Sequence, residues 1–324
     1  MADLEWPVPA QPVLGDRDGA LARAEYLLYR AAVGFVSHWP RPAQAAFVEV
    51  LARTAKALDA RHSGAARGYV RQALGSRLDE AGVERTVLAA WKHLIGLTIE
   101  DARFNERVLG PELERHFDVE LSADARRALD ARSGGLFVVP HVGMWEAMPA
   151  IGAVLGFRPA YVVSRPPRNL PLSRFAQATR EARGYRLIHR HGAIEGLMEV
   201  VEKGGWVGLM LDQRARGKTI VAPFFGRPAH CERSIPILVR RLKKPVVFGA
   251  TYRTARPFHY RTVIDRVLWP EELSRLGPEA IASAINREME RQILVAPEQY
   301  FWLHDRYRKA PPLEASGAAD PRRD

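Results

Sequence analysis

The chain has 324 residues, enough to bury the core of one large α/β domain or of two small ones. Its formal net charge of +11 predicts an acidic partner, such as anionic lipid headgroups, nucleic acid or an acidic carrier protein. The single cysteine, Cys231, excludes an internal disulfide and a cysteine-rich zinc site. The sequence lacks a run of about 18 uncharged apolar residues, so we expect any contact with a membrane to be peripheral.

The first part of the chain has helical patterns. Residues 1–20 are rich in proline, glycine and aspartate and lack the apolar run of a secretory signal, so we expect a flexible leader there. From Leu21 to Trp39 apolar residues recur every three to four positions, which predicts an amphipathic helix. Such a helix can pack on the domain or lie in a bilayer interface. Further helical patterns indicate a helical layer over residues 21–132.

From residue 133 to 309, short apolar runs alternate with helical segments. This alternation predicts an α/β fold with a mixed, mostly parallel sheet flanked by helices, in a single domain with the helical layer. Residues 310–324 are expected to be disordered. The candidate strands are Leu136–Val139, Pro159–Val163, Tyr185–Ile188, Trp206–Leu211, Val246–Tyr252 and Tyr260–Ile264. The candidate helices between and after them are Glu146–Leu155, Ser173–Arg183, Ala193–Lys203, Arg233–Leu242 and Pro278–Leu294.

A histidine lies just past the first candidate strand. Pro140 ends that strand because it has no N–H to donate, and His141 then stands at the strand's carboxyl end, where ligands collect in open α/β sheets. A neutral imidazole can remove a proton from a hydroxyl, and a carboxylate on its other nitrogen would orient it. We therefore predict that His141 and Glu146, in the next helical turn, act as a pair. The alternative is a structural histidine, with Glu146 a favourable first-turn charge.

Two other strand ends carry polar side chains. Arg165 follows the second candidate strand and could bind a phosphate or carboxylate, while Asn169 could orient its loop. Asp212 and Gln213 follow the fourth candidate strand and could anchor a loop or contact a substrate. The alternative for Arg165 is a surface arginine in a basic protein.

The sequence offers a weaker case for a metal. His189 and His191 are one residue apart and, with His141 or Asp212, could in principle hold zinc. The helical His-Glu-x-x-His pattern is missing, so we expect neither a metal nor another cofactor, and a metal-dependent hydrolase remains an alternative. We expect no nucleic-acid partner, because the cationic residues are spread along the chain and no nucleic-acid-binding module is recognisable.

Four ordered segments, across about half of the chain, resemble sequence blocks of the bacterial lipid A late acyltransferases of the lauroyl/myristoyl type. The first two are His141-Val-Gly-Met-Trp-Glu146 and Ser164-Arg165-Pro166-Pro167-Arg168-Asn169. The third begins at Asp212-Gln213 and continues through Val221-Ala-Pro-Phe-Phe-Gly226, and the fourth is Gln299-Tyr-Phe-Trp-Leu-His304-Asp-Arg306. Met144 stands where the family commonly has asparagine, and Ala222 interrupts the usual Val-Pro pair.

The resemblance implies a fold like that of glycerolipid acyltransferases and an O-acyltransferase activity. A fatty acyl group would pass from an acyl-carrier-protein or coenzyme A thioester to a hydroxyl of a lipid A precursor or a related lipid, without an acyl-enzyme. It also implies a peripheral place on the cytoplasmic face of a bacterial inner membrane, in lipopolysaccharide synthesis. A non-catalytic, basic membrane-binding protein is the other alternative.

The resemblance also assigns expected roles to residues of these segments. His141 and Glu146 would be catalytic. Backbone N–H groups after His141, or the guanidinium of Arg165, would stabilise the oxyanion. The residues expected to bind substrate are Arg165, Asn169, Asp212, Gln213, Trp145, Phe224 and Phe225, the last two as part of the wall of an acyl-chain site.

Overall fold

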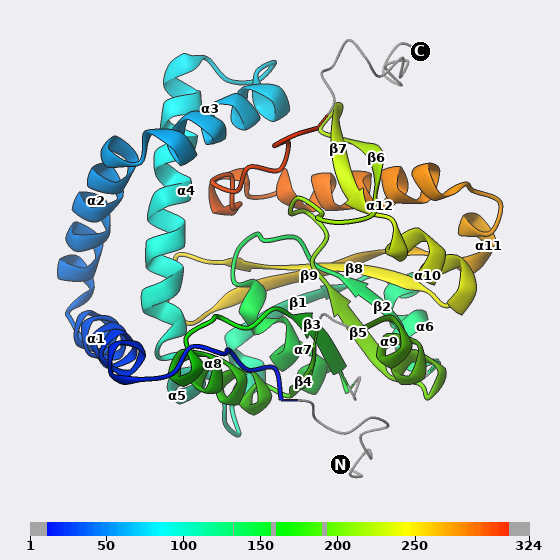
Figure 1. Cartoon of the computed structure of the whole chain (residues 1–324), viewed down its shortest axis with the longest axis horizontal. Coiled ribbons are helices and arrows are strands. Elements are labelled where there is room, and N and C mark those ends of the chain that lie inside the picture. Colours follow the sequence, from blue (N-terminus) through cyan, green and yellow to red (C-terminus); the bar gives the residue numbers. More distant parts are fainter. Residues whose placement is uncertain (1–11, 132, 157–159, 190–192, 311–324) are drawn as a thin grey trace.

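The apolar runs predicted as strands assemble into one seven-stranded sheet. A computed structural model describes residues 12–131, 133–156, 160–189 and 193–310 of the chain. The strand order is β1-β9-β8-β2-β5-β3-β4 (Figure 1). The strands of this sheet are β1 (Phe117–Leu121), β2 (Gly135–Val138), β3 (Ala160–Ser164), β4 (Tyr185–His189), β5 (Trp206–Leu209), β8 (Val246–Arg253) and β9 (Tyr260–Leu268).

All neighbouring strands of the sheet run parallel except β8 and β9, which are antiparallel. The predicted mixed, mostly parallel sheet is therefore confirmed. Strand β2 lies between β5 and β8 and is buried at all four positions, as expected for a central strand covered on both faces.

Two parts of the sheet structure were not predicted. Strand β1 falls inside the predicted helical layer and pairs with β9, so residues 21–132 and 133–309 share one sheet. The antiparallel hairpin of β6 (Thr219–Phe224) and β7 (Arg227–Glu232) forms a separate two-stranded sheet. Pro223 and Pro228 lie opposite each other in that hairpin, and proline weakens the sequence signal of a strand.

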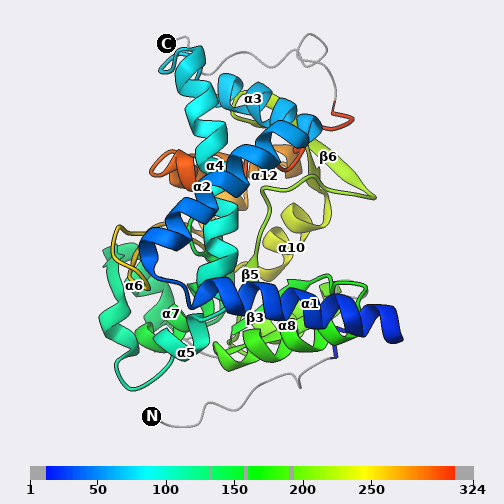
Figure 2. The ribbon, with the colours of Figure 1, turned by 90° about the vertical axis from the view of Figure 1, so that its left-hand side faces the viewer.

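Helices cover both faces of the sheet, and α2 and α4 stand beside the ends of its strands (Figures 1 and 2). The α-helices are α1 (Ala20–Ser37), α2 (Arg41–Leu58), α3 (Ala60–Leu74), α4 (Glu80–Asp101), α5 (Phe104–Val108), α6 (Ala123–Asp130), α7 (Met148–Leu155), α8 (Leu170–Ala182), α9 (Ala193–Glu202), α10 (Ser234–Leu242), α11 (Pro270–Leu273) and α12 (Pro278–Ile293). Short 3₁₀ turns are η1 (Leu113–His116), η2 (Trp145–Ala147) and η3 (Pro297–Gln299).

The two faces of the central strand belong to two hydrophobic clusters. Leu136 and Val138 pack in the cluster that holds side chains of α9, α10 and α12. Phe137 and Val139, which point to the opposite face, pack with side chains of α6 and α7. The alternation along β2 therefore fixes a three-layer architecture. Helix α4 lies beside the carboxyl ends of β2 and β8. Its His93 contacts the backbone after β2, and its Glu100 binds Arg253, the last residue of β8.

The described part of the predicted leader, residues 12–19, lies against α8. The backbone N–H of Val13 donates to Gln177 at 2.9 Å, and that of Gly15 donates to Ser173 at 2.8 Å. Val13 is buried. This stretch is thus packed, whereas we expected it to be flexible; residues 1–11 and 311–324 lie outside the described part of the chain.

Asn169 connects α8 to α1. Its side-chain oxygen accepts from the backbone N–H of Leu172 at 3.0 Å and caps α8. Its amide nitrogen donates to the carbonyl of Ala22 at 2.8 Å and to the carboxylate of Glu25 at 3.1 Å. Asn169 is buried, and its bond to the carbonyl of Ala22 is shielded from water.

We expect Asn169→Ala to lower the free energy of unfolding by about 1–3 kcal/mol, because a helix cap and two hydrogen bonds to α1, one of them buried, are lost. Asn169→Ser retains a capping oxygen and should lose about half as much. Urea unfolding followed by circular dichroism measures both values. Ser122→Ala, which removes the cap of α6, is a matched control without a link to α1. A wild-type stability for Asn169→Ala would contradict the link.

Candidate active site

The register of two parallel strands brings His141 and Asp212 together. Val138 of β2 pairs with Leu209 of β5, and His141 and Asp212 each follow three residues later. Because the strands are parallel, both chains leave the sheet at the same edge and at the same height. The two side chains meet there, at the carboxyl ends of the strands, where open α/β sheets bind ligands.

Asp212 holds His141 at two points. Its Oδ1 lies 2.6 Å from Nδ1 of the imidazole, and its Oδ2 accepts from the backbone N–H of His141 at 2.7 Å. Burial by itself would raise the pKa of the Asp212 carboxyl, but the charge and hydrogen bonds of His141 outweigh burial and lower that pKa. The buried carboxylate of Asp212 can therefore stabilise the imidazolium form of His141.

The second ring nitrogen of His141 faces Gln213. The amide nitrogen of Gln213 lies 3.1 Å from Nε2 of the ring. An amide nitrogen only donates, so Nε2 accepts here and the proton of the neutral ring sits on Nδ1, facing Asp212. This tautomer leaves the lone pair of Nε2 in position to take a proton from a hydroxyl. The side chain of His141 remains 15% exposed, so a substrate can reach it.

In the turn after His141, the backbone N–H groups of residues 142–144 donate to carbonyl groups of the protein. The N–H of Val142 donates to Pro140 at 2.8 Å and that of Gly143 to Gln299 at 3.1 Å. The N–H of Met144 donates to Thr251 at 2.6 Å. We expected backbone N–H groups after His141 as possible oxyanion donors, but at 142–144 they are already bonded, which leaves side chains as the candidates.

Gly143 is required by the close approach of two backbones. It adopts a φ of 63°, and a Cβ there would lie 2.1 Å from the carbonyl oxygen of Thr251. The carbonyl of Gly143 lies 3.1 Å from Nε2 of the buried His93, on α4. Burial first, and then the nearby charge of Arg253, lower the pKa of His93 to about 3. His93 is therefore neutral and fixes this turn against α4.

A largely apolar cavity of about 500 Å³ opens beside His141. The aromatic side chains of Phe137 on β2, Tyr161 on β3 and Trp206 on β5 lie in its wall. Strands β3 and β5 also contribute further lining residues. The ring of Trp145 stands edge-on to that of His141, 5.4 Å away, and Phe301 lies 6.3 Å from it. The remaining lining residues are Leu94, Val139, Glu146, Met148, Pro149, Ala160, Val162, Val163, Ser164, Arg165, Arg180, Gly208, Leu209, Met210 and Gln213.

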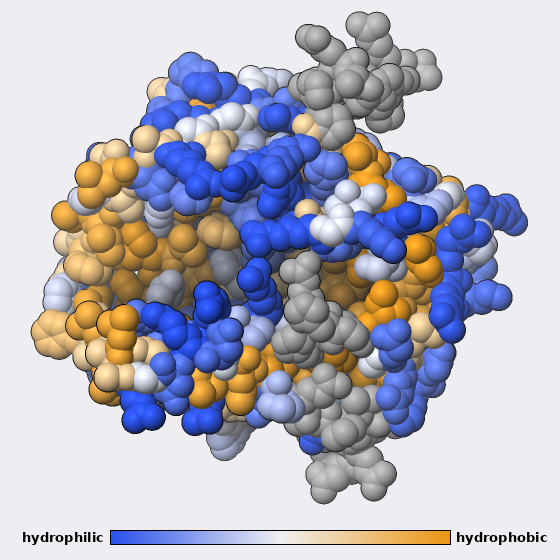
Figure 3. Space-filling model, viewed as in Figure 1, coloured by the Kyte–Doolittle hydropathy of each residue, from blue (hydrophilic) through white to orange (hydrophobic). Residues whose placement is uncertain are grey.

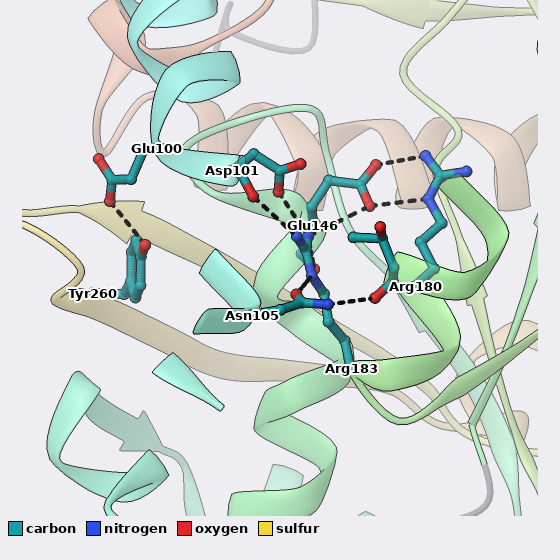
Figure 4. Close-up of polar contacts among 8 residues, drawn as sticks. Glu100, Asp101, Asn105, Glu146, Arg180, Arg183 and Tyr260 are labelled. Carbon is teal, nitrogen blue, oxygen red and sulfur yellow. Dashed lines mark hydrogen bonds and ion pairs between the residues drawn. The ribbon is translucent and has the colours of Figure 1, made fainter. Parts of the chain in front are cut away.

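Glu146 lies in the cavity wall and is bound by Arg180 (Figure 4). Nε and Nη2 of Arg180 donate to its two carboxylate oxygens at 3.0 and 2.6 Å. Arg180 also donates to Ser164 at the end of β3. The contact with the His141 ring that we expected from Glu146 is made by Asp212, because five residues of turn and 3₁₀ helix direct Glu146 toward α8. The catalytic role of Glu146 stays a prediction.

A second arginine, the C-cap residue of α8, supports the same turn. The side chain of Arg183 is fully buried and lies 2.7 Å from a carboxylate oxygen of Asp101 (Figure 4). It also donates to Asn105 at 2.7 Å and to the carbonyl of Glu146 at 3.3 Å. Burial raises the pKa of Asp101, against the lowering effect of Arg183. The loop that carries Glu146 is thus fixed by charged side chains of α4 and α8.

The other predicted site residues divide into two groups. Trp145, Arg165 and Gln213 line the cavity, as expected for residues that bind a substrate. Asn169 does not line it, because its side chain is used to cap α8 and hold α1.

Phe224 and Phe225 belong to the second group. They pack against each other and against Tyr307 and Trp302, away from the cavity lining. They therefore form a buried aromatic corner instead of the predicted wall of an acyl-chain site, and the aromatic side chains of the cavity wall come from other residues.

The C-terminal segment completes the site, which the sequence interpretation did not assign in detail. The N–H of Phe301 donates to the carbonyl of His141 at 3.0 Å. The buried guanidinium of Arg306 donates to the carbonyl of Gln213 at 2.7 Å, and Nε2 of His304 accepts from the N–H of Arg214 at 3.1 Å. These residues fall within the fourth block of the sequence resemblance, which was the available signal.

The described residues provide no cluster of ligands for the metal site considered above. There, no group of three or more histidine, cysteine, aspartate or glutamate side chains could hold a metal ion. His191 lies outside the described residues, and nothing is described of the side chain of His189.

Comparison with known proteins identifies the family. The family model of bacterial lipid A biosynthesis acyltransferases matches residues 19–309. The chain belongs to this family. It is similar to the lipid A biosynthesis palmitoleoyltransferase of Escherichia coli (strain K12) and to a lipid A biosynthesis acyltransferase of Shigella flexneri, at 27% identity over 207 residues in each case. The match covers 63% of this chain and 65% of each relative, so it spans just under two thirds of the length of these family members.

Among the described residues, none of the helices is both long and apolar enough to cross a membrane.

His93 leads to a prediction about pH. Its pKa of about 3 lies below that of an exposed histidine, near 6.5, so the unfolded chain binds the proton more readily between these values. Stability should therefore be full above pH 6.5 and fall as the pH is lowered. His93 alone should contribute a loss of about 2 kcal/mol between pH 7 and 5.

His93→Gln retains a donor for the carbonyl of Gly143 and does not titrate. We expect urea unfolding of this variant to depend less on pH over the same range, with an unchanged denaturant slope. An identical pH dependence in the wild type and the variant would contradict the assignment.

Proposed function

We propose that this protein transfers a fatty acyl group from an acyl thioester to a hydroxyl of a lipid A precursor or a related glycolipid. The observation that supports this most is the position of His141. Its Nε2 lone pair stands at one end of an apolar cavity, and its Nδ1 is bound to the buried Asp212. A base beside an apolar cavity suits a reaction that joins an acyl chain to a hydroxyl.

In the proposed reaction, Nε2 of His141 takes the proton of the acceptor hydroxyl as its oxygen attacks the thioester carbonyl. The negative charge moves to the carbonyl oxygen of a tetrahedral intermediate. This intermediate collapses, the carbon–sulfur bond breaks, and the thiolate takes the proton from the imidazolium. Asp212 stabilises the imidazolium meanwhile, and no acyl-enzyme forms. Atoms and charges balance without a further reactant.

Two side chains are suited to stabilise the oxyanion. The amide of Gln213 lies next to Nε2 of His141, and one of its N–H groups can turn to the oxyanion once the acceptor hydroxyl binds the ring. Arg165 is the second, because it lies in the cavity wall and has no carboxylate within ion-pair distance among the described residues. Preorganised donors of this kind commonly provide a large part of catalysis.

The cavity is proposed to hold the acyl chain. Its wall follows β3 and β5 backward from their carboxyl ends at Ser164 and Leu209 to Ala160 and Trp206. A chain lying there would extend from the reacting carbonyl at His141 along the sheet. The apolar wall excludes water from the chain and from the thioester.

The partners follow from this reaction. We propose acyl carrier protein or coenzyme A as the carrier of the acyl group and a membrane surface as the source of the lipid acceptor. The net charge of +11 suits all three, since each is acidic. Exposed apolar side chains on α1 and α2 support the membrane as a partner, and we place the protein peripherally on the cytoplasmic face of the inner membrane.

Substitutions of Asp212 and Glu146 distinguish the roles of these two carboxylates. If Asp212 orients and stabilises the imidazole, we expect this variant and His141→Ala each to lower acyl transfer at least about a hundredfold. Glu146→Gln keeps the shape of the cavity wall and should lower transfer less. The measurement is transfer of radiolabelled acyl from acyl carrier protein, and separately from coenzyme A, to membrane lipid.

Asp124→Asn, an exposed carboxylate-to-amide change on α6, controls for the loss of one charge. A large loss in Glu146→Gln together with an active Asp212→Asn would reverse the assignment of the two carboxylates. Binding to membranes without transfer by the wild type from either donor would favour the non-catalytic alternative, and inhibition by chelators would favour the hydrolase.

Ala160→Phe should shorten the cavity at the end away from His141. We expect a shift of at least about tenfold in kcat/KM toward shorter acyl thioesters, because each methylene that no longer fits costs binding energy. Competition among thioesters of different chain length, with mass spectrometry of the product lipid, measures this shift. Ala131→Phe at the end of α6 adds the same bulk outside the cavity and controls for general effects. Unchanged selectivity in Ala160→Phe would exclude this cavity as the acyl site.

A further inference from the structure

The C-terminal segment, residues 299–306, contacts the turns that follow both β2 and β5. Its backbone holds the turn after β2. The carbonyl of Gln299 accepts from the N–H of Gly143 at 3.1 Å, and the N–H of Phe301 donates to the carbonyl of His141 at 3.0 Å. Its side chains hold the turn after β5. One short stretch of chain therefore sets the position of one strand end relative to the other.

Two side chains of this segment bind the same peptide unit. The carbonyl of Gln213 accepts from Nη1 of Arg306 at 2.7 Å. The N–H of Arg214, which belongs to the same peptide unit, donates to Nε2 of His304 at 3.1 Å. The carbonyl and the N–H of a trans peptide point in opposite directions, so bonds on both sides hold its plane against rotation. The backbone of Gln213 is thereby fixed.

The side chain of Gln213 is the one that faces the proposed base. Its amide nitrogen lies 3.1 Å from Nε2 of His141. A glutamine side chain has several rotatable bonds, so its amide stays in one place only if the backbone below it is fixed. The residues that follow, 216–218, are exposed, and the loop itself therefore provides little restraint. The restraint comes from the C-terminal segment.

His304 has the protonation state that its contact with Arg214 requires. Burial is the largest cause that lowers the pKa of His304, to about 4, while the charge of Asp212 acts in the opposite direction. The ring is therefore neutral near pH 7. Its Nε2 keeps a lone pair that can accept from the N–H of Arg214, and its proton lies on Nδ1.

Arg306 uses a buried charge to bind backbone. It is 2% exposed, and its Nη1 also donates to the carbonyl of His230. Its Nη2 lies 3.3 Å from Sγ of Cys231, so the guanidinium joins Gln213 to strand β7. Burial of a charged side chain is costly unless hydrogen bonds replace those to water. Here one of these bonds fixes the turn that carries Gln213.

We propose that His304 and Arg306 are positioning residues for acyl transfer. They hold the peptide between Gln213 and Arg214 so that the amide of Gln213 stays beside the ring of His141, from where it can turn to the oxyanion. This inference rests on the proposed function, in which Gln213 is a candidate oxyanion donor. It adds roles for two residues that do not line the cavity.

The C-terminal segment lies at the edge of the fold, so one of its side chains can be changed without altering the sheet. Figure 1 shows the segment in red, between α12 and the C-terminus, and Figure 3 shows hydrophilic residues over this part of the molecule. His304 is half-buried, whereas Arg306 is buried. His304 is therefore the better position for a test.

The test is a double-mutant cycle of His304→Ala with Gln213→Ala, with kcat and KM for acyl transfer measured in each variant. We expect His304→Ala to lower kcat about tenfold with little change in KM, because the oxyanion donor acts in the transition state. In the Gln213→Ala background the same change should lower kcat less than about twofold, because its target is gone. His304→Gln retains an acceptor for the N–H of Arg214 and should restore most of the activity.

His116→Ala is the matched control. This ring is also half-buried, and its Nδ1 lies 2.6 Å from the carbonyl of Phe258, away from the lining of the cavity beside His141. Its kcat should equal that of the wild type. Equal losses from His304→Ala with and without Gln213 would overturn the proposal, since His304 would then not act through Gln213. If His304→Ala folds poorly by circular dichroism, His304→Phe keeps the bulk of the ring, removes the acceptor and replaces it in the cycle.

A second measurement does not depend on transfer. Diethyl pyrocarbonate modifies neutral imidazole, and mass spectrometry of peptides gives its rate at His141. We expect His304→Ala to raise this rate about fivefold, because the loss of one hydrogen bond lets the amide of Gln213 leave the ring more often. Gln213→Ala should raise it at least as much, with no further rise in the double variant.

An unchanged modification rate in His304→Ala would overturn the positioning role, whatever the activity of the wild type. A raised rate together with a wild type that transfers no acyl group would count against the proposed function alone, because the position of Gln213 would still depend on His304. The two proposals therefore fail in distinguishable ways.

Discussion

The double contact between Asp212 and His141 is the constraint on which the candidate site depends. One carboxylate binds both the ring and the backbone N–H of the histidine, so it fixes the position of the side chain and of the strand end that carries it. The contact exists because β2 and β5 pair in parallel with Val138 opposite Leu209. A shift of that register by one residue would turn one of the two side chains to the other face of the sheet. The pairing of β2 with β5 therefore determines the contact on which the proposed chemistry of the site depends.

The surroundings of this pair are held mainly by charged and polar groups from distant parts of the sequence. Arg180 of α8 binds the carboxylate of Glu146, and Arg183, just after that helix, binds the carbonyl of Glu146. Asp101 of α4 binds Arg183. Removing one member of such a buried group leaves another charge without its partner, which costs far more than the pair itself contributes. The arrangement thus favours one geometry of the turn over others. The C-terminal segment adds to this through Phe301, whose N–H binds the carbonyl of His141.

Much of the fold followed from local patterns. Strand β2 is a short apolar run between a glycine-rich turn and a proline. The predicted strands agree with the observed ones to within two residues at each end, except β9, which continues four residues past the predicted end at Ile264. Strand β1 was missed because two of the five residues of Phe117–Leu121 are acidic and exposed, at the edge of the sheet. Hairpin β6–β7 was missed because prolines stand in both strands. In each case the pairing with a distant partner, and not the local sequence, makes the strand.

By itself, the sequence determined the class of fold, the strand end that carries His141, and the group of residues near it, because these depend on periodicity and on residues a few positions apart. It also suggested a partner for the imidazole, Glu146, by proximity in the chain. Only the tertiary structure decided that the carboxylate on the ring is Asp212, 71 residues away. It likewise placed Phe224 and Phe225 in a buried corner and Asn169 at a helix cap. The physical reason is the same throughout: a side chain's partner is set by strand register and helix packing, which join residues far apart in sequence, whereas a motif records only residues that are close along the chain.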